Sequence, residues 1–414
     1  MASESIDAAV WRLVNSFVAQ SDDQAQGRDS RLAGSDDCRQ FCDMVGSNNG
    51  KLNQILSQCA EQMSKESFLR LVISLGDLFA QYGELSRAEE MYTIALAQGE
   101  LHGEHSAIGE ALIRRGAIYS RLGRWKDSQS DLVQGRRIYQ DLHEEKGIGR
   151  AESLLGFNYA LGGDTKKAQT YIRRAIDAFE RLEERQFSGG ALMNLGVVFR
   201  ILGDFDSAMS QFQRARSNFE EVGDLERLAE LHHQIGMTLL AKELVEPALR
   251  AFELSATVSA GLNNNKIRGL SFLGKANAFF QIGDLRTSLS LADQALDHFS
   301  IFEDRLLVAD VYKLKGAIHC KLMKLELAHW YLFTSLKIHG EVGSCVGLGD
   351  CYFELGRLHA ARGRMLDAKR VLQLSADAYT KAGAAHELKR VSLELFAIRG
   401  KRTNELRRSR QAKD

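Results

Sequence analysis

A small residue recurs at a strict 40-residue interval along most of this chain. It stands second in the phrases LGDLFAQYG at 75–83, LGFNYALGG at 155–163 and LGVVFRILG at 195–203. The eight positions, which we call the anchors, are Gly76, Gly116, Gly156, Gly196, Gly236, Ala276, Gly316 and Gly356. A period of this length restricts the fold to an array of similar units, because each unit must bury its apolar face against its neighbours.

Three further columns keep the same phase. Bulky residues stand three positions after the anchors, at Phe79, Tyr119, Tyr159, Phe199, Leu239, Phe279, His319 and His359. Small residues stand twelve positions after them, at Ala88, Ser128, Ala168, Ala208, Ala248, Ser288, Ala328 and Ala368. Aromatic residues stand 23 positions after five of them, at Tyr139, Phe179, Phe219, Phe299 and Tyr379. Small residues let two antiparallel helices approach closely and large ones fill the space between hairpins, so each unit is predicted to be helix A, a short turn and a longer helix B.

The turn inside each unit has its own signal. Glycine stands seven positions after six of the anchors, at Gly83, Gly123, Gly163, Gly203, Gly283 and Gly363. Because glycine tolerates the left-handed conformation that ends a helix, helix A is predicted to stop there. Glu243 and Met323 replace it in the fifth and seventh units, which indicates either local bends or sequence drift. The only proline, Pro247, falls near the start of the fifth helix B, where a missing N–H costs little.

The columns in LGDLFAQYGELSRAEEMYTIAL and LGVVFRILGDFDSAMSQFQRA resemble the tetratricopeptide (TPR) repeat family, and the 40-residue period resembles its longer subclass. The resemblance implies an all-α fold, a right-handed α-solenoid of eight TPR hairpins with helical end caps. It covers residues 69–388, which we expect to form the repeat domain. Residues 1–68 would then be an N-terminal helical extension with a linker, and 389–414 a capping helix with a basic tail.

The ends carry weaker patterns. Residues 1–20 have the spacing of an amphipathic helix, 21–50 resemble a flexible link, and 51–66 are predicted to form a helix that covers the first repeat. At the other end, 386–399 can supply a cap with Val391, Leu395 and Phe396 facing inward. The tail 399–414 holds seven basic and two acidic residues without an aromatic residue among them, as expected of a solvated tail rather than a nucleic-acid contact.

No chemical motif accompanies the repeat. The sequence contains no phosphate loop, no H-E-x-x-H and no G-x-S-x-G, so no catalytic residue, cofactor or metal ligand is assigned and no enzyme activity is expected. The six cysteines do not have the spacing of a zinc site, and His102 and His105 are expected to be ordinary surface or core residues. The 54 basic and 54 acidic residues cancel, so no global field favours a nucleic acid or an anionic membrane as partner. No small-molecule substrate is evident from the sequence.

The resemblance also suggests where a partner would bind, because helix A faces line a groove in TPR arrays. Eleven residues of the third to sixth repeats fall in the groove columns: Phe157, Leu161, Met193, Asn194, Val197, Arg200, Ile201, Met237, Leu240, Asn277 and Phe280. This set is unusually apolar for positions that need not pack within a hairpin. It indicates a groove for a helix or an extended peptide, or else a tight winding that buries these side chains against the next helix A.

We therefore expect a protein-interaction scaffold or adaptor that holds a partner helix or peptide in the groove. The second hypothesis is a peptide-responsive regulator, similar to bacterial TPR proteins in which an N-terminal helical region acts on a signalling target. A protein or peptide is the expected partner in both cases. Without a secretory signal or a membrane-spanning run in the sequence, the expected location is the cytoplasm.

Overall fold

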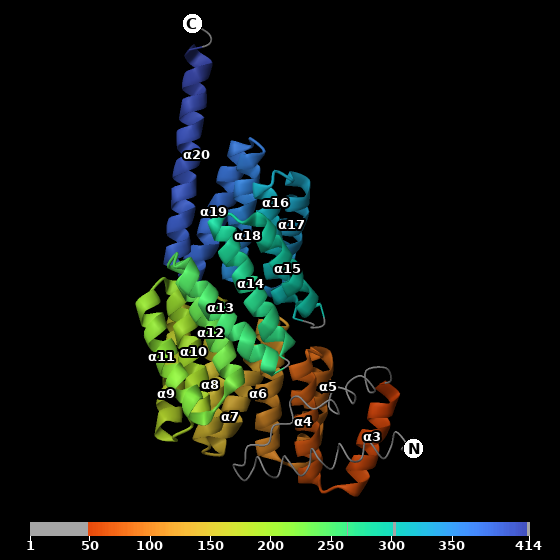
Figure 1. Cartoon of the computed structure of the whole chain (residues 1–414). Helices are drawn as coiled ribbons and strands as arrows, with labels where there is room; N and C mark the ends of the chain where they lie inside the picture. Colours follow the sequence, from red (N-terminus) through yellow and green to blue (C-terminus); the bar gives the residue numbers. More distant parts are fainter. Residues whose placement is uncertain (1–48, 263, 301–303, 412–414) are drawn as a thin grey trace. The chain divides into compact units, whose positions relative to one another are not determined.

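A computed structural model describes residues 49–262, 264–300 and 304–411, and all its regular elements are α-helices (Figure 1). The described helices are α3 (Asn49–Gln62), α4 (Lys65–Tyr82), α5 (Leu85–His102), α6 (His105–Arg121), α7 (Trp125–Asp141), α8 (Glu145–Leu161), α9 (Thr165–Arg181), α10 (Arg185–Leu202), α11 (Phe205–Val222), α12 (Leu225–Ala241), α13 (Val245–Gly261), α14 (Asn265–Ile282), α15 (Leu285–Phe299), α16 (Arg305–Lys321), α17 (Leu325–Val342), α18 (Cys345–Ala361), α19 (Met365–Ala382) and α20 (Ala385–Gln411). Within these residues no helix is long and apolar enough to cross a membrane.

The helices from α4 to α19 pair in chain order as helical hairpins, with one anchor on the first helix of each pair. The all-α solenoid expected from the repeat is therefore confirmed. The two helices of a hairpin are nearly equal in length, for example 17 residues each in α8 and α9, so the expectation of a longer helix B is wrong. The chain divides into two compact units, of which the first holds 49–120 and 126–148 and the second holds 121–125 and 149–411 of the described residues.

The anchors are small because the partner helix leaves no room for a side chain. A Cβ atom on Gly76 would lie 2.5 Å from the ring of Tyr92, and one on Gly196 would lie 2.4 Å from Phe212. Where the second small column has serine, a hydrogen bond also joins the two helices of the hairpin. Ser288 Oγ, for example, donates to the carbonyl of Ala276 at 2.7 Å. Both columns thus fix how closely the helices of a hairpin pack.

The turn between helix A and helix B has the same backbone conformation in every repeat. The six glycines have φ between 75° and 93°, and Glu243 and Met323 have φ of 61° and 59°. The two non-glycine turns are therefore left-handed like the others and introduce no bend. Sequence drift, rather than a change of geometry, explains these two positions.

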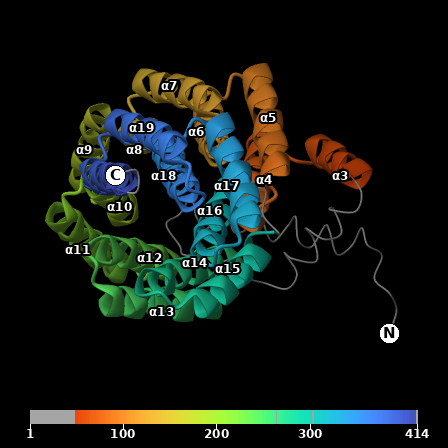
Figure 2. The ribbon, with the colours of Figure 1, turned by 90° about the horizontal axis from the view of Figure 1, so that it is seen from above.

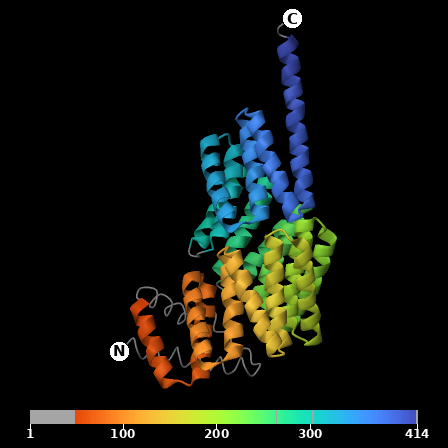
Figure 3. The same cartoon turned by 180° about the vertical axis from the view of Figure 1, so that it is seen from behind.

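The second unit returns on itself. Its last helices α18 to α20 meet the C-terminal ends of α8 and α10; Figure 2 looks down on them, and Figure 3 shows them at a different level from α8 to α10. The Cα of Gly163 is so close to the chain at Lys381 that a Cβ atom would lie 2.6 Å from the Lys381 carbonyl oxygen. Cys345 Sγ lies 3.4 Å from the carbonyl oxygen of Gly162, and the rings of Phe205 and His386 are 5.1 Å apart. These contacts join the third and fourth repeats to the eighth repeat and its cap.

The caps agree with the expectations in part. Helix α3 begins two residues before the expected start and ends four residues before the expected end at 66, and it buries Leu52, Leu56 and Cys59. The expectations for residues 1–20 and most of 21–50 lie outside the described residues. On α20, Val391 is fully buried and Leu395 packs against the core of the second unit. Phe396 is 76% exposed, so its expected inward position is wrong. Residues four apart share a helix face, and the next position is turned by about 100° from that face.

Candidate functional site

The inner face of the second unit is formed by the first helices of its hairpins. Successive first helices contact one another from α10 through α12, α14 and α16 to α18, while α9, α11 and α13 lie outside them (Figure 2). The columns proposed to line a groove lie on these inner helices. The structure buries three of the eleven candidate residues, which we call the covered part, and leaves the other eight half-buried. Four of these eight, on α12 and α14, we call the open part.

The covered part is on α10. Met193, Val197 and Ile201 are only 7%, 9% and 8% exposed, and they belong to one apolar core with Phe353 of α18 and Val391 of α20. The three side chains are therefore buried within the second unit, in a core that also includes residues of its last helices. A partner cannot reach these three side chains without displacing those helices.

Two further candidates belong to the covered end. Phe157 on α8 is half-buried and packs against the same core, and Leu161, one turn further along α8, is also half-buried. Asn194 donates from Nδ2 to Ser153 Oγ at 3.4 Å, which links α10 to α8. These residues contribute to the contact between repeats.

The open part lies on α12 and α14. Met237, Leu240, Asn277 and Phe280 are half-buried in the absence of any partner. Asn277 donates from Nδ2 to the carbonyl of Leu273 at 2.9 Å, which turns the amide along its own helix. These four candidates, two on each of two helices that contact each other, are half-buried, and Phe280 also packs against the core around Leu273 and Phe299. We call the four residues the open wall.

A cation borders the open wall. Lys321 of α16 places Nζ 4.0 Å from the ring centroid of Phe280 and donates to the carbonyl of Phe280 at 3.2 Å. Burial and the neighbouring Arg357 lower the pKa of Lys321. An ammonium above an aromatic face is an attractive contact.

A charged cluster fills the interior beside the covered part. Lys313 of α16 lies 3.1 Å from Asp310 and 2.6 Å from Asp350, and Tyr379 donates to Asp350 at 2.5 Å. Burial opposes the charge of Lys313, but Asp350 and Asp310 outweigh it and raise the lysine pKa. Burial likewise opposes the charge of Asp350, and Lys313 outweighs it and lowers the pKa of the carboxyl. The pair is therefore ionised and mutually satisfied, as a structural ion pair is.

Arg200 is the candidate that connects this cluster to α10. It donates from Nη2 to Gln234 at 3.3 Å, and its buried Nε makes no hydrogen bond within the described structure. Burial lowers the pKa of Arg200, against the opposing effect of the carboxylates of Glu387 and Asp350. Burial, with Asp350 adding to it, raises the pKa of Glu387.

The sequence columns did not single out this cluster, although they hold a signal for it. Lys313 stands three residues before its anchor, where five of the other seven repeats have Ile73, Ile113, Met193, Leu273 and Phe353 and the remaining two have Ser153 and His233. A charge in a mainly apolar column indicates a nearby partner of opposite charge. Asp310 lies on the same helix as Lys313, whereas Asp350 and Tyr379 come from the next repeat. Among the described residues, no group of three or more histidine, cysteine or carboxylate side chains could hold a metal ion.

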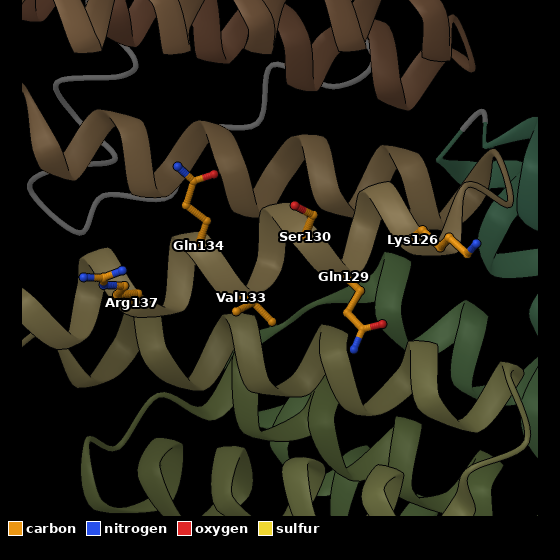
Figure 4. A pocket seen from close by; sticks show the side chains of 6 residues that line it. All are labelled: Lys126, Gln129, Ser130, Val133, Gln134 and Arg137. Atoms are coloured by element: carbon orange, nitrogen blue, oxygen red, sulfur yellow. The ribbon is translucent and has the colours of Figure 1, made fainter.

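A depression of about 580 Å³ lies away from these residues, on α7 in the first unit (Figure 4). Its lining is Lys126, Gln129, Ser130, Val133, Gln134 and Arg137, all from one helix. Ligand sites bring polar groups together from several elements around an apolar interior. Because all the lining side chains extend from a single helix, this depression lacks the converging polar groups of a ligand site.

The hairpin geometry and the glycine columns define the class of protein: in its fold this is a tetratricopeptide-repeat protein. A model of the tetratricopeptide repeat matches residues 162–221, which hold the end of the third repeat and most of the fourth. A search of curated protein sequences finds no match.

Several solved structures share the fold. A Rap protein complexed with competence and sporulation factor is similar over 94% of this chain and 98% of its own, with a TM-score of 0.55 and 12% identity. The Rap conjugation gene regulator of plasmid pLS20, in complex with the Phr* peptide, is similar over 68% and 77% of the two chains, with a TM-score of 0.56 and 18% identity. The hetero-tetramer Cut9–Hcn1 of the APC/C is similar over 94% and 63%, with a TM-score of 0.57 and 16% identity. At these identities the likeness concerns the fold.

Proposed function

We propose that this protein is a peptide-responsive regulator, and that it binds a short peptide on the open wall formed by Met237, Leu240, Asn277 and Phe280. The observation that carries the proposal is the division of the inner face. Because Met193, Val197 and Ile201 of α10 are buried, the half-buried apolar candidates beyond them lie on two helices only. A wall of this size suits an extended peptide of a few residues better than a long partner helix.

The chemistry of the wall sets the kind of peptide. Met237 and Phe280 offer adaptable and flat apolar contacts, and Asn277 offers an amide of the kind that bonds to a peptide backbone. Lys321 beside Phe280 adds a cation at one edge. We therefore infer a peptide with apolar side chains and one carboxylate, either a side chain or the C-terminus.

Two of the similar structures support a regulatory role by analogy of fold, since they are a Rap protein with competence and sporulation factor and a Rap regulator with the Phr* peptide. This analogy favours the regulator over the scaffold that the groove columns first indicated. An N-terminal region acting on a signalling target completes the proposal.

A peptide selection tests the binding site. A displayed library of random short peptides is selected on the full chain, and the enriched peptides are titrated against Met237→Glu and Phe280→Glu by fluorescence anisotropy. We expect at least a tenfold weaker affinity for each variant, because a carboxylate on the wall desolvates poorly and repels the peptide carboxylate.

Leu254→Glu is the matched control, since Leu254 is 52% exposed on α13, outside the inner layer. It should leave the affinity unchanged. Failure to enrich any peptide, or equal loss in the control, contradicts the proposed site. Enrichment of peptides that bind only as helices favours the scaffold instead.

A further inference from the structure

The outer face of the seventh repeat differs from that of the other repeats. Fourteen residues after the anchor, on the second helix of each hairpin, the sequence has Trp330, whereas the other copies have Glu90, Ser130, Thr170, Ser210, Arg250, Ser290 and Arg370. Three residues further on it has Phe333, whereas six of the other seven copies are polar. Since the eight repeats share one scaffold, the other seven show that hairpin packing requires no aromatic residue here.

Both aromatic side chains are open to solvent on α17. Trp330 is 55% exposed and Phe333 is 57% exposed. Each is held by neighbouring rings: Tyr331 and Tyr312 have centroids 5.0 Å and 5.9 Å from Trp330, and His329 stacks on Phe333 at 6.0 Å. Exposed aromatic residues held in place before binding are typical of the central contacts of protein interfaces.

The charges around the aromatic pair indicate the occupant. Glu326, Trp330, Phe333 and Lys337 follow at steps of four, three and four residues, so they share one face of α17. When two copies of this face pack antiparallel about a two-fold axis between positions 331 and 332, Trp330 of each copy faces Phe333 of the other. The same axis brings Glu326 of each copy opposite Lys337 of the other.

We propose that this face of α17 binds a second copy of this chain and forms a two-fold homodimer. Two-fold interfaces are self-complementary: when residue i contacts j, j also contacts i. This face meets that condition for both its aromatic pair and its charge pair. A parallel arrangement would place each charge against its like, which excludes it.

The charged side chains are available for the contact. The side chain of Glu326 is 92% exposed and pairs with Arg362 at 2.7 Å, and the side chain of Lys337 is 69% exposed with Glu341 at 4.0 Å. The Lys337–Glu341 pair lies at the surface, where such pairs hold their partners weakly, and Glu326 stays open to solvent although the side chain of Arg362 is largely buried. One helix from each copy buries close to the lower limit of a specific interface, about 1,000 Å², so the dimer is expected to be reversible.

Sedimentation velocity of the full chain tests the proposal over concentrations from about 1 to about 100 µM. The unmodified chain should shift from the monomer of 46.1 kDa toward twice that mass. Trp330→Ser with Phe333→Ser should stay monomeric over the whole range. Leu254→Ser, which removes an equally exposed apolar residue from α13, should dimerise like the unmodified chain.

Two charge-reversal variants give the decisive test, because they leave Trp330 and Phe333 unchanged. K337E alone places two carboxylates opposite each other, and E326K alone places two ammonium groups opposite each other, so each variant should be monomeric. An equimolar mixture of the two should dimerise again, because every charge then faces its opposite. Circular dichroism checks that each variant keeps its helices.

Three outcomes overturn the proposal. One is a chain that stays monomeric at all these concentrations. Another is a dimer that neither charge variant weakens, which would place the interface elsewhere. The third is a mixture of the two charge variants that stays monomeric, which would exclude the antiparallel pairing.

Discussion

The left-handed turn position shows how little a repeat needs in order to keep its geometry. Glu243 adopts φ of 61° at the place where Gly283 has φ of 89°. A side chain in this region brings Cβ close to the carbonyl oxygen, which costs about 1–2 kcal/mol. The surrounding hairpin therefore holds Glu243 in a conformation that the residue itself disfavours.

Replacing Glu243 by glycine should raise the free energy of unfolding by about 0.5–1 kcal/mol, because the relief of strain exceeds the added freedom of the unfolded chain. Urea denaturation measures the change. Glu243→Gln, which removes the charge and keeps the strain, should leave stability unaltered. The reverse change, Gly283→Glu, should lower it, since open space surrounds Gly283 and backbone strain is then the only new cost.

His233 carries a second prediction at this scale. It is 6% exposed on α12, its Nδ1 has no hydrogen-bond partner within the described structure, and Arg200, Glu230 and Asp310 are the charged groups that act on it. Burial, reinforced by Arg200, lowers the pKa of His233 to about 4. The folded state therefore binds this proton less readily than the unfolded state does.

The sign follows from that difference. The stability that neutral, buried His233 contributes is fully present above its unfolded-state pKa of about 6.5. It is lost as the pH falls toward the folded-state pKa of about 4, and the free energy of unfolding drops by about 2 kcal/mol between pH 6.5 and pH 5. His233→Met should remove this part of the pH dependence, and Met193 fills the same column in the fourth repeat. Other buried histidines titrate too, so urea midpoints of both proteins are compared at each pH. If the urea midpoints of the two proteins changed with pH in the same way, His233 would not be the group responsible.

At the scale of the elements, the turn between α8 and α9 acts as a contact point as well as a link. Gly163 and Gly283 occupy the same column with φ of 93° and 89°. A Cβ on Gly163 would strike the backbone at Lys381, whereas a Cβ on Gly283 meets nothing within 4 Å. The two glycines form a matched pair that separates backbone strain from the contact with the eighth repeat.

Gly283→Ala should cost about 1 kcal/mol through strain alone, and Gly163→Ala should cost at least about 1 kcal/mol more, because the chain at Lys381 must move. Cys345, 4% exposed beside Gly162, reports the movement. Its rate of alkylation, followed by peptide mass spectrometry, should rise in Gly163→Ala only. Equal costs and equal rates in both variants would mean that the turn does not hold the eighth repeat.

At the scale of the molecule, the hairpins were predictable from sequence because their determinants are local. The clash between an anchor glycine and an aromatic ring of the partner helix joins residues 16 apart, as in Gly76 and Tyr92. Eight copies then repeat the same signal in phase. The turn after helix A was predictable for the same reason, including its position where glycine is missing.

The return of the second unit was not predictable from the columns. It joins Gly163 to Lys381 and Met193 to Val391 across about two hundred residues, and nothing in these columns marks those positions as partners. The candidate binding residues could not be sorted from sequence for the same reason: Val197 and Met237 occupy the same column of the fourth and fifth repeats, yet only Val197 lies in the covered core. The inward position predicted for Phe396 was wrong for a different reason. Phe396 follows Leu395 directly on the helix, so its side chain points about 100° away from the buried face.

The return also constrains how such a chain can change over evolutionary time. An open array tolerates the gain or loss of a unit, because each unit meets only its neighbours. Here the contact between the third repeat and the eighth requires that a fixed number of hairpins separate them. Duplication or deletion of one 40-residue copy between them would rotate Cys345 and Lys381 away from the turn at Gly163 and expose the core on α10. Repeats between the third and the eighth therefore cannot be added or removed without loss of this contact. New binding properties must arise by substitution rather than by changes in repeat number.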